Sequence, residues 1–268
     1  MMLRLDASIW AIILNLDKKM LVIYTDKHTN RLGYTLNFIF KDVLKIDYMV
    51  TLSKETFIAE KGAKLSYSQE PVYEELHLTQ TNLLFETDIN NIDLNFFEKE
   101  GFPFLFRSYN QDDFLEFDVF AAVFYMISRY EEYMPFVADK HGRFSPEDSV
   151  AVEHNFLEKP VVDIWINILK NKILEKYPNE KFSQRIFSFL NTIDVDMAYC
   201  YKGKGMYRGM GGFIRDLINR DFSACKDRLK VIFLGKKDPY NCFDFLQTII
   251  SKNALKTLIF YLIASSSD

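Results

Sequence analysis

The sequence predicts an α/β fold built from two strand–helix–strand units with helices between them. Residues 20–52 and 187–264 each begin and end with an apolar strand and carry helical spacing in between. Such a crossover connection makes the two strands of a unit parallel. The intervening residues 112–177 carry apolar side chains mostly at helical spacing. The expected domains are an N-terminal α/β module at 1–110, a helical connector at 111–185 and a second α/β unit at 186–268.

The composition is that of a globular protein without a nucleic-acid partner. The 268 residues are 49% hydrophobic and 26% charged, and the net charge of -4 supplies no basic field for nucleic acid. Three cysteines, an odd number, fit a reducing compartment better than a disulfide framework. The apolar run at 7–16 is too short to span a bilayer, and no signal-peptide cleavage site follows it. We therefore expect a cytoplasmic protein without a membrane span.

The N-terminal module is expected to contain a small parallel sheet. Met20–Thr25 and Ile46–Leu52 are apolar strand candidates, and Arg31–Leu44 between them has apolar residues at helical spacing. Thr56–Ser68 and Val72–Phe85 are typical of further short strands, because Gly62 and Pro71 punctuate them. The isolated residues His28 and His77 are expected to be structural or exposed.

The connector is expected to be mainly helical. Phe96–Phe106 is typical of a loop or short strand, whereas Asp112–Tyr133 and Val161–Tyr177 have the apolar stripe of amphipathic helices. Ser145 begins a cap signature that is completed by a proline and two acids. The polar turn Asp139–Phe144 could contact a sugar or phosphate, but pairing between its arginine and a carboxylate is the more economical explanation.

Two carboxylates mark the predicted strand Phe187–Val195 of the last unit. Thr192, Asp194 and Asp196 share one face of an extended chain, with the two aspartate Cα atoms roughly 6–7 Å apart. An aspartate after a strand often only caps the next turn. Two on one face of a buried strand are costly unless they are paired or bind a metal. The end of the strand is therefore the candidate site.

A glycine-rich stretch follows this strand and is expected to be a loop. It contains no dinucleotide fingerprint, because Arg208 stands where the third glycine of G-x-G-x-x-G would be. Helices are expected at Phe213–Arg220, at Ala224–Phe233 and from Asp238 through Lys252. A second buried strand is expected at Leu258–Ala264. The glycines are Gly203, Gly205, Gly209, Gly211 and Gly212.

Four motifs in this order resemble a group of bacterial polysaccharide deacetylase-like proteins. They are the stretches Phe124–Tyr133, Asp139–Phe144, Thr192–Asp196 and Asp238–Tyr240. In that group an N-terminal α/β module precedes a carbohydrate esterase domain of NodB type, a distorted (β/α) barrel. The resemblance implies metal-dependent hydrolysis of N-acetyl groups on a glycan. It also implies that residues 186–268 form the first strands of such a barrel.

The resemblance implies roles for the two aspartates and also exposes a departure. Asp194 takes the position of the general base, and Asp196 that of a ligand to zinc or a similar divalent metal. The family completes its metal site with two later histidines, whereas all four histidines here precede Asp194, at 28, 77, 141 and 154. A full barrel needs roughly 200 residues or more, and few follow Asp196. We therefore expect a truncated, inactive portion of the enzyme that binds metal weakly or not at all.

Other functions remain open at this point. One is a non-catalytic module that binds glycans or acts as a scaffold. Another is an Asp-x-Asp phosphatase, which Ala198 disfavours, and a third is a metal-dependent glycosyltransferase, for which no nucleotide-binding unit is evident. An incomplete barrel would also leave an unpaired strand edge at Leu258–Ala264, so self-association through that edge is expected.

Overall fold

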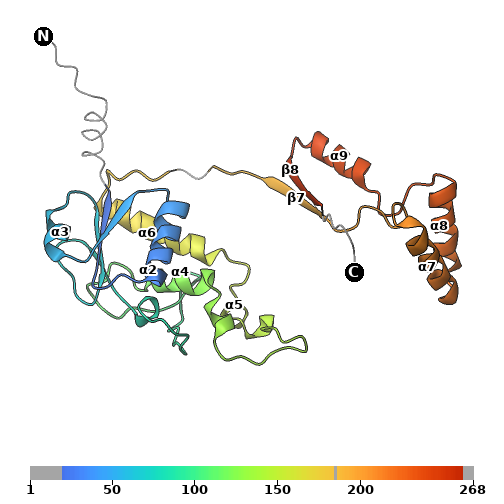
Figure 1. The fold of residues 1–268 in the computed structure, drawn as a ribbon. Coiled ribbons are helices and arrows are strands. Elements are labelled where there is room, and N and C mark those ends of the chain that lie inside the picture. Colours follow the sequence, from blue (N-terminus) through green and yellow to red (C-terminus); the bar gives the residue numbers. More distant parts are fainter. Residues whose placement is uncertain (1–19, 184–185, 262–268) are drawn as a thin grey trace, which may run out of the picture. The chain divides into compact units, whose positions relative to one another are not determined.

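The computed structural model describes residues 20–183 and 186–261, and the chain divides into two compact units (Figure 1). The N-terminal unit ends at Gln184 and the C-terminal unit begins at Arg185. Both contain parallel strands and helices, so the predicted α/β class is confirmed. In the described ranges, none of the helices combines the length and apolar character that crossing a membrane requires.

A four-stranded parallel sheet forms the centre of the N-terminal unit. Its strand order is β2-β1-β3-β4, and every neighbouring pair is parallel. Strand β1 pairs with β2 and β3, so the predicted strand–helix–strand unit is confirmed. The strands are β1 (Leu21–Thr25), β2 (Tyr48–Thr51), β3 (Lys64–Ser68) and β4 (Leu76–Thr79).

Helices cover both faces of this sheet, as parallel sheets require. Side chains of β1 alternate between the two faces. Leu21 and Ile23 pack into the main core with the helices α2, α4 and α6, whereas Val22 and Tyr24 pack against Phe57 of α3. Figure 1 shows α3 on one side of the sheet and the other helices on the opposite side. The helices are α2 (Asn30–Leu36), α3 (Lys54–Ala59), α4 (Val119–Ile127), the short α5 (Val150–Glu153) and α6 (Val161–Lys176).

Two predictions about the N-terminal module need correction. The stretch Thr56–Ser68 is not all strand, because Ser53 caps α3 by accepting a hydrogen bond from Thr56 N at 3.1 Å. The predicted helix Arg31–Leu44 is helical, but its second half, Asn37–Val43, has π-helical hydrogen bonding. Its inward residues Leu32, Leu36, Ile39 and Phe40 are all fully buried.

Helix α4 is much shorter than the predicted Asp112–Tyr133. Asp118 sets its start, because its side chain accepts from Phe120 N and Ala121 N, both at 3.0 Å. Just before it, Phe117 bridges to Arg107 in extended conformation. At the other end Arg129 adopts a left-handed conformation with φ of 53° and stops the helix. Local capping and pairing therefore override the apolar stripe.

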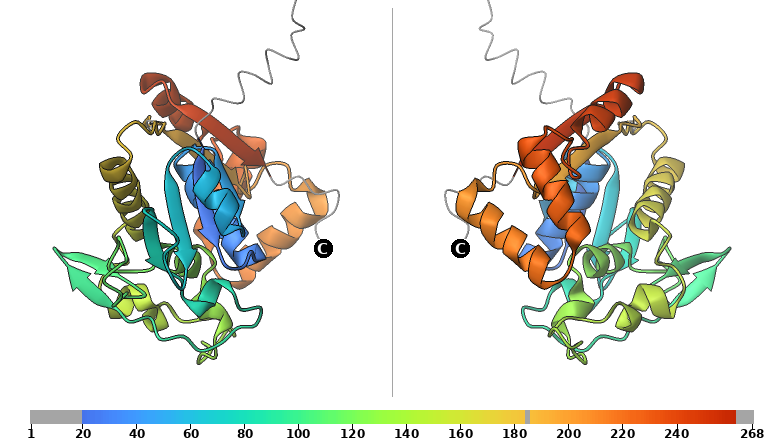
Figure 2. Two further views of the ribbon diagram at one scale, coloured as in Figure 1. Left: turned by 90° about the vertical axis from the view of Figure 1, so that its left-hand side faces the viewer. Right: turned by 90° about the vertical axis from the view of Figure 1, so that its right-hand side faces the viewer.

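The helices expected in a separate connector belong to the same core as the sheet. Trp165 of α6 is fully buried, and its Nε1 donates to Pro103 O at 2.8 Å. Pro103 lies in an antiparallel hairpin of β5 (Phe97–Lys99) and β6 (Phe102–Phe104), which projects from the unit in Figure 2. The structure thus joins residues 111–183 to the N-terminal unit.

The C-terminal unit pairs two parallel strands that are joined through three helices. Strands β7 and β8 pair from Leu190↔Lys256 to Val195↔Tyr261, as the expected crossover requires. Helices α7 and α8 pack against each other (Figures 1 and 2). The elements are β7 (Leu190–Val195), α7 (Gly205–Ile218), α8 (Phe222–Phe233), α9 (Phe243–Lys252) and β8 (Lys256–Tyr261).

Three expectations for this unit are wrong in detail. The first strand begins at Leu190 instead of Phe187, and its residues alternate between exposed and half-buried instead of being buried. The second strand begins at Lys256 and is also largely exposed, while residues 262–264 lie outside the described ranges. The glycine-rich stretch is largely helical, because all its glycines except Gly203 fall within α7.

Candidate functional site

The two predicted site aspartates lie at the carboxyl end of β7. Asp194 is the penultimate strand residue, paired with Phe260, and Asp196 lies in the bend that follows. Both are exposed, whereas Ile193 and Val195 between and beside them are half-buried. This alternation is that of an extended chain whose odd and even positions face opposite sides. Both carboxylates are thus open to solvent at the edge where α/β folds commonly bind ligands.

The described residues do not fit a complete site for the metal that the resemblance implies. A catalytic zinc usually takes three protein ligands and leaves one position for water. Across residues 20–183 and 186–261, no group of three histidine, cysteine, aspartate or glutamate side chains is placed to hold one ion. Asp194 and Asp196 therefore supply part of a donor set.

A third aspartate organises the loop that follows the strand. Asp238 is only 2% exposed, and four backbone N–H groups donate to its carboxylate. Cys200 N and Tyr240 N donate to Oδ1 at 2.7 and 3.0 Å. Tyr201 N and Lys202 N donate to Oδ2 at 2.8 and 3.1 Å. Asp238 thereby ties the loop after β7 to the segment that leads into α9.

These hydrogen bonds keep Asp238 ionised. Burial raises the pKa of its carboxyl group, but the N–H donors favour the charged form and outweigh burial. The net effect is a pKa below the usual value. In the sequence Asp238 stands out only as part of a motif, and this role was not visible, because three of its four partners lie about forty residues earlier in the chain.

A buried ion pair joins α7 to α8 behind this loop. Arg228 donates to Asp216 Oδ2 from Nη2 at 2.7 Å and from Nε at 3.2 Å, and both residues are less than one-tenth exposed. The guanidinium also lies over the ring of Tyr201, 4.7 Å from its centroid. A Cβ atom on Gly212 would come within 2.7 Å of Arg228 Nη2, so only glycine lets the guanidinium lie this close to α7.

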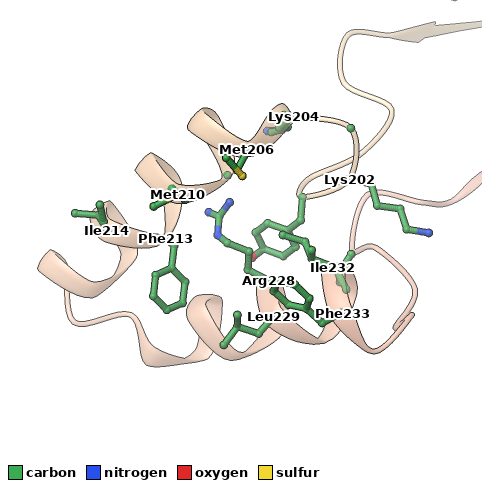
Figure 3. A pocket seen from close by; sticks show the side chains of 15 residues that line it. Lys202, Lys204, Met206, Met210, Phe213, Ile214, Arg228, Leu229, Ile232 and Phe233 are labelled. Carbon is green, nitrogen blue, oxygen red and sulfur yellow. The ribbon is translucent and has the colours of Figure 1, made fainter.

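An apolar groove of about 610 Å³ runs between α7 and α8. Figure 3 shows Met206, Met210 and Phe213 of α7 on one side of it and Leu229 and Ile232 of α8 on the other. Lys204 lies beside Met206 at one end, whereas the side chain of Lys202 points away. The groove is open to solvent: Met206 is 73% and Met210 59% exposed.

A buried polar network in the N-terminal unit contains the residue types of a nucleophilic triad. Ser66 Oγ donates to Glu75 Oε1 at 2.6 Å and lies 2.8 Å from His77 Nδ1, while His77 Nε2 lies 3.8 Å from Asp113 Oδ1. Ser66 is fully buried, so no substrate reaches its hydroxyl group. The network therefore joins β3 to β4. The direct pairing of Ser66 with His77 across the sheet was not visible in the sequence.

The polar turn at 139–144 is held together by its own residues. Arg143 donates to Asp139 Oδ2 from Nη2 at 3.0 Å and from Nε at 3.1 Å. The backbone N–H groups of His141 and Arg143 donate to Asp139 Oδ1. This agrees with the ion-paired loop that the sequence favoured over a sugar or phosphate contact.

Comparison with known proteins identifies the family from the N-terminal unit. A family model described as "Family of unknown function (DUF7033)" matches residues 21–178, which is more than half of the chain. No curated protein and no solved structure matches the chain. The matched range begins with β1 and ends just after α6, so it comprises the sheet and the helices that share its core. The chain therefore belongs to DUF7033, a family of unknown function.

Proposed function

We propose that the C-terminal unit is the opening segment of a NodB-type barrel and that the parent enzyme is a metal-dependent polysaccharide deacetylase. One observation carries this proposal: Asp194 and Asp196 lie at the carboxyl end of a parallel strand, with helices and a second parallel strand after them. Barrel enzymes place their catalytic groups at this end of their strands.

The two aspartates would have separate duties. Asp194 would accept the proton of an attacking water as general base, and Asp196 would be one ligand of a divalent metal. Both side chains are exposed, so a glycan can approach them. Because the described residues provide only part of a donor set, the 268-residue chain is expected to hold metal weakly and to release no acetate.

Equilibrium dialysis against Co²⁺ tests the role of Asp196 because it measures bound metal directly. We expect weak binding, and Asp196→Asn should abolish it. Asp221→Asn is the matched control, since the Asp221 side chain caps α8 by accepting from Ala224 N at 2.9 Å. An Asp196→Asn variant that binds Co²⁺ like the wild-type chain would refute the assignment.

The activity test uses the same proteins with Zn²⁺ and N-acetylglucosamine oligomers. Acetate release should stay at the level of the metal-only blank. Tight stoichiometric zinc together with acetate release that Asp194→Asn abolishes would show that the chain is a complete enzyme with other ligands.

We also propose that the exposed strands of the C-terminal unit form a self-association surface. The consecutive residues from Leu258 to Tyr261 are between 42% and 54% exposed. Neighbouring residues of a strand point to opposite faces, so apolar side chains are open on both faces of β8. Parallel sheets are normally covered on both faces. A second copy of the chain that packs against β8 would remove its exposed apolar side chains from water.

A further inference from the structure

A second cavity of the C-terminal unit, of about 710 Å³, is lined by a different stripe of α7 from the apolar groove. On α7, Met206, Met210 and Phe213 line the groove, whereas Arg208, Gly212 and Arg215 line this cavity. In a helix, residues three or four positions apart share a face. Met197, the residue after Asp196, also lines this cavity. The cavity therefore adjoins the carboxyl end of β7.

The lining of this cavity carries an excess of positive charge. Among the described residues of the lining, the basic ones are Lys204, Arg208, Arg215 and Arg228, and the acidic one is Asp216. Asp216 is already bound by Arg228 through two hydrogen bonds. Its other oxygen lies 3.8 Å from Arg215 Nε. One carboxylate thus faces two guanidinium groups, and the cavity retains net positive charge.

Lys204 and Arg215 are the cations best placed to meet a ligand. The Lys204 side chain makes no hydrogen bond or ion pair with another residue of the described ranges. Arg215 has a side chain that is 75% exposed, and its contact with a carboxylate of the described residues is the long one to Asp216. Carboxylate and phosphate groups are the partners that lysine and arginine bind most strongly.

Tyrosine rings complete the lining. Tyr240 is 48% exposed and Tyr201 is half-buried beneath Arg228. Aromatic rings offer a flat apolar face with a polar tip, which suits the apolar face and hydroxyl groups of a sugar ring. Asp238 fixes both residues in place through their backbone N–H groups.

We propose that this cavity binds a sugar unit that carries a carboxylate or phosphate group. Lys204 and Arg215 bind the anionic group, and Tyr240 packs against the ring. The assignment to a sugar rests on the proposed deacetylase function, whereas the assignment to an anion rests on the cavity's charge. The substrate of the parent enzyme would accordingly be an acidic glycan.

Calorimetric titration of the full chain tests this with five probes: glucuronate, glucose 6-phosphate, glucose, inorganic phosphate and a neutral N-acetylglucosamine oligomer. Glucuronate, glucose 6-phosphate or both should bind more tightly than glucose, inorganic phosphate and the neutral oligomer. The tighter of the two anionic sugars shows whether the site prefers a carboxylate or a phosphate group. Lys204→Gln and Arg215→Gln should each weaken that binding about three- to fivefold, because each removes an ion pair that is partly screened by solvent. Lys226→Gln, an exposed change on α8 outside the cavity, should leave it unaltered.

The outcomes separate the two proposals. Equal binding of glucose and the anionic sugars, or anionic-sugar binding that survives both variants, overturns the anionic site but leaves the deacetylase proposal intact. Phosphate binding as tight as that of glucose 6-phosphate, without glucuronate binding, overturns the assignment to a sugar. Binding of an anionic sugar that depends on Lys204 and Arg215 supports the site. If Asp196→Asn leaves Co²⁺ binding unchanged at the same time, only the deacetylase proposal fails. Absence of binding by all probes overturns the site.

Discussion

Asp238 is the residue on which the loop after the candidate site depends most. Its carboxylate accepts from the N–H groups of Cys200, Tyr201, Lys202 and Tyr240. A neutral asparagine has one acceptor oxygen, and its amide group would face N–H donors with its own hydrogens. The charge of Asp238 is therefore as important as its shape.

Asp238→Asn should lower the local stability of the loop by about 2–3 kcal/mol, since it leaves buried N–H groups without an acceptor. Hydrogen exchange at Cys200–Lys202 measures the effect. Asp221→Asn is a suitable control, because asparagine caps helices about as well as aspartate. Unchanged protection at residues 200–202 in Asp238→Asn would mean that the four hydrogen bonds contribute little.

The lowered pKa of Asp238 also gives this prediction a pH dependence. Its stabilising contribution is present above the unfolded-state pKa of about 3.9 and is lost as the pH falls through the lower folded-state pKa. Protection at Cys200–Lys202, corrected for intrinsic exchange, should therefore fall below about pH 4 in the wild-type chain. The Asp238→Asn variant should lack that step.

Helix α7 is the element in which glycine has two different roles. Gly212 lies against the buried guanidinium of Arg228, whereas a Cβ atom on Gly211 would meet nothing within 4 Å. Arg228 cannot easily withdraw, because Asp216 and Tyr201 hold it. The same substitution at two neighbouring positions should therefore have opposite effects.

Gly211→Ala should stabilise the C-terminal unit by about 0.5–1 kcal/mol through helix propensity. Gly212→Ala gains the same propensity but forces the Arg228 side chain aside, and a net loss of about 1–2 kcal/mol is expected. Urea unfolding followed by hydrogen exchange in α7 and α8 gives both values. Equal stabilisation by the two variants would show that Arg228 moves freely.

At this scale the sequence predicted most elements and misjudged several boundaries. Helix α6 follows from its apolar periodicity and strand β1 from its continuous apolar run, because these patterns match how the two elements are buried. Helix α4 starts late because Asp118 caps it from within the apolar stripe. The first half of helix α7 was predicted as a loop, since its glycines lower helix propensity and the packing of Gly212 against Arg228 is a tertiary contact. Such contacts also hid the environment of Asp238.

The two units of the chain differ in how completely their apolar side chains are buried. In the N-terminal unit the sheet and helices enclose one large apolar cluster that includes Trp165. In the described part of the C-terminal unit, the buried apolar residues are Cys225 and Val231, and large apolar side chains of β8 and α7 are exposed. The domain matched by DUF7033 thus contains its own core. The apolar pattern of the sequence predicted buried strands in both units. Such a pattern marks an apolar face, but it does not show whether another helix or strand packs against that face.

A chain of residues 20–183 should therefore fold alone and remain monomeric, whereas the full chain should associate as its concentration rises. Tryptophan fluorescence in urea, with Trp10→Phe in the full chain so that Trp165 is the reporter in both proteins, compares their stabilities. The short chain should have a free energy of unfolding within about 1 kcal/mol of the value from the full chain, because its core lies within the N-terminal unit. Sedimentation velocity measures the association. Ile259→Lys and Phe260→Lys replace apolar side chains on opposite faces of β8, and each should weaken it. A monomeric full chain, or association of the short chain alone, would rule out the exposed strands as the contact surface.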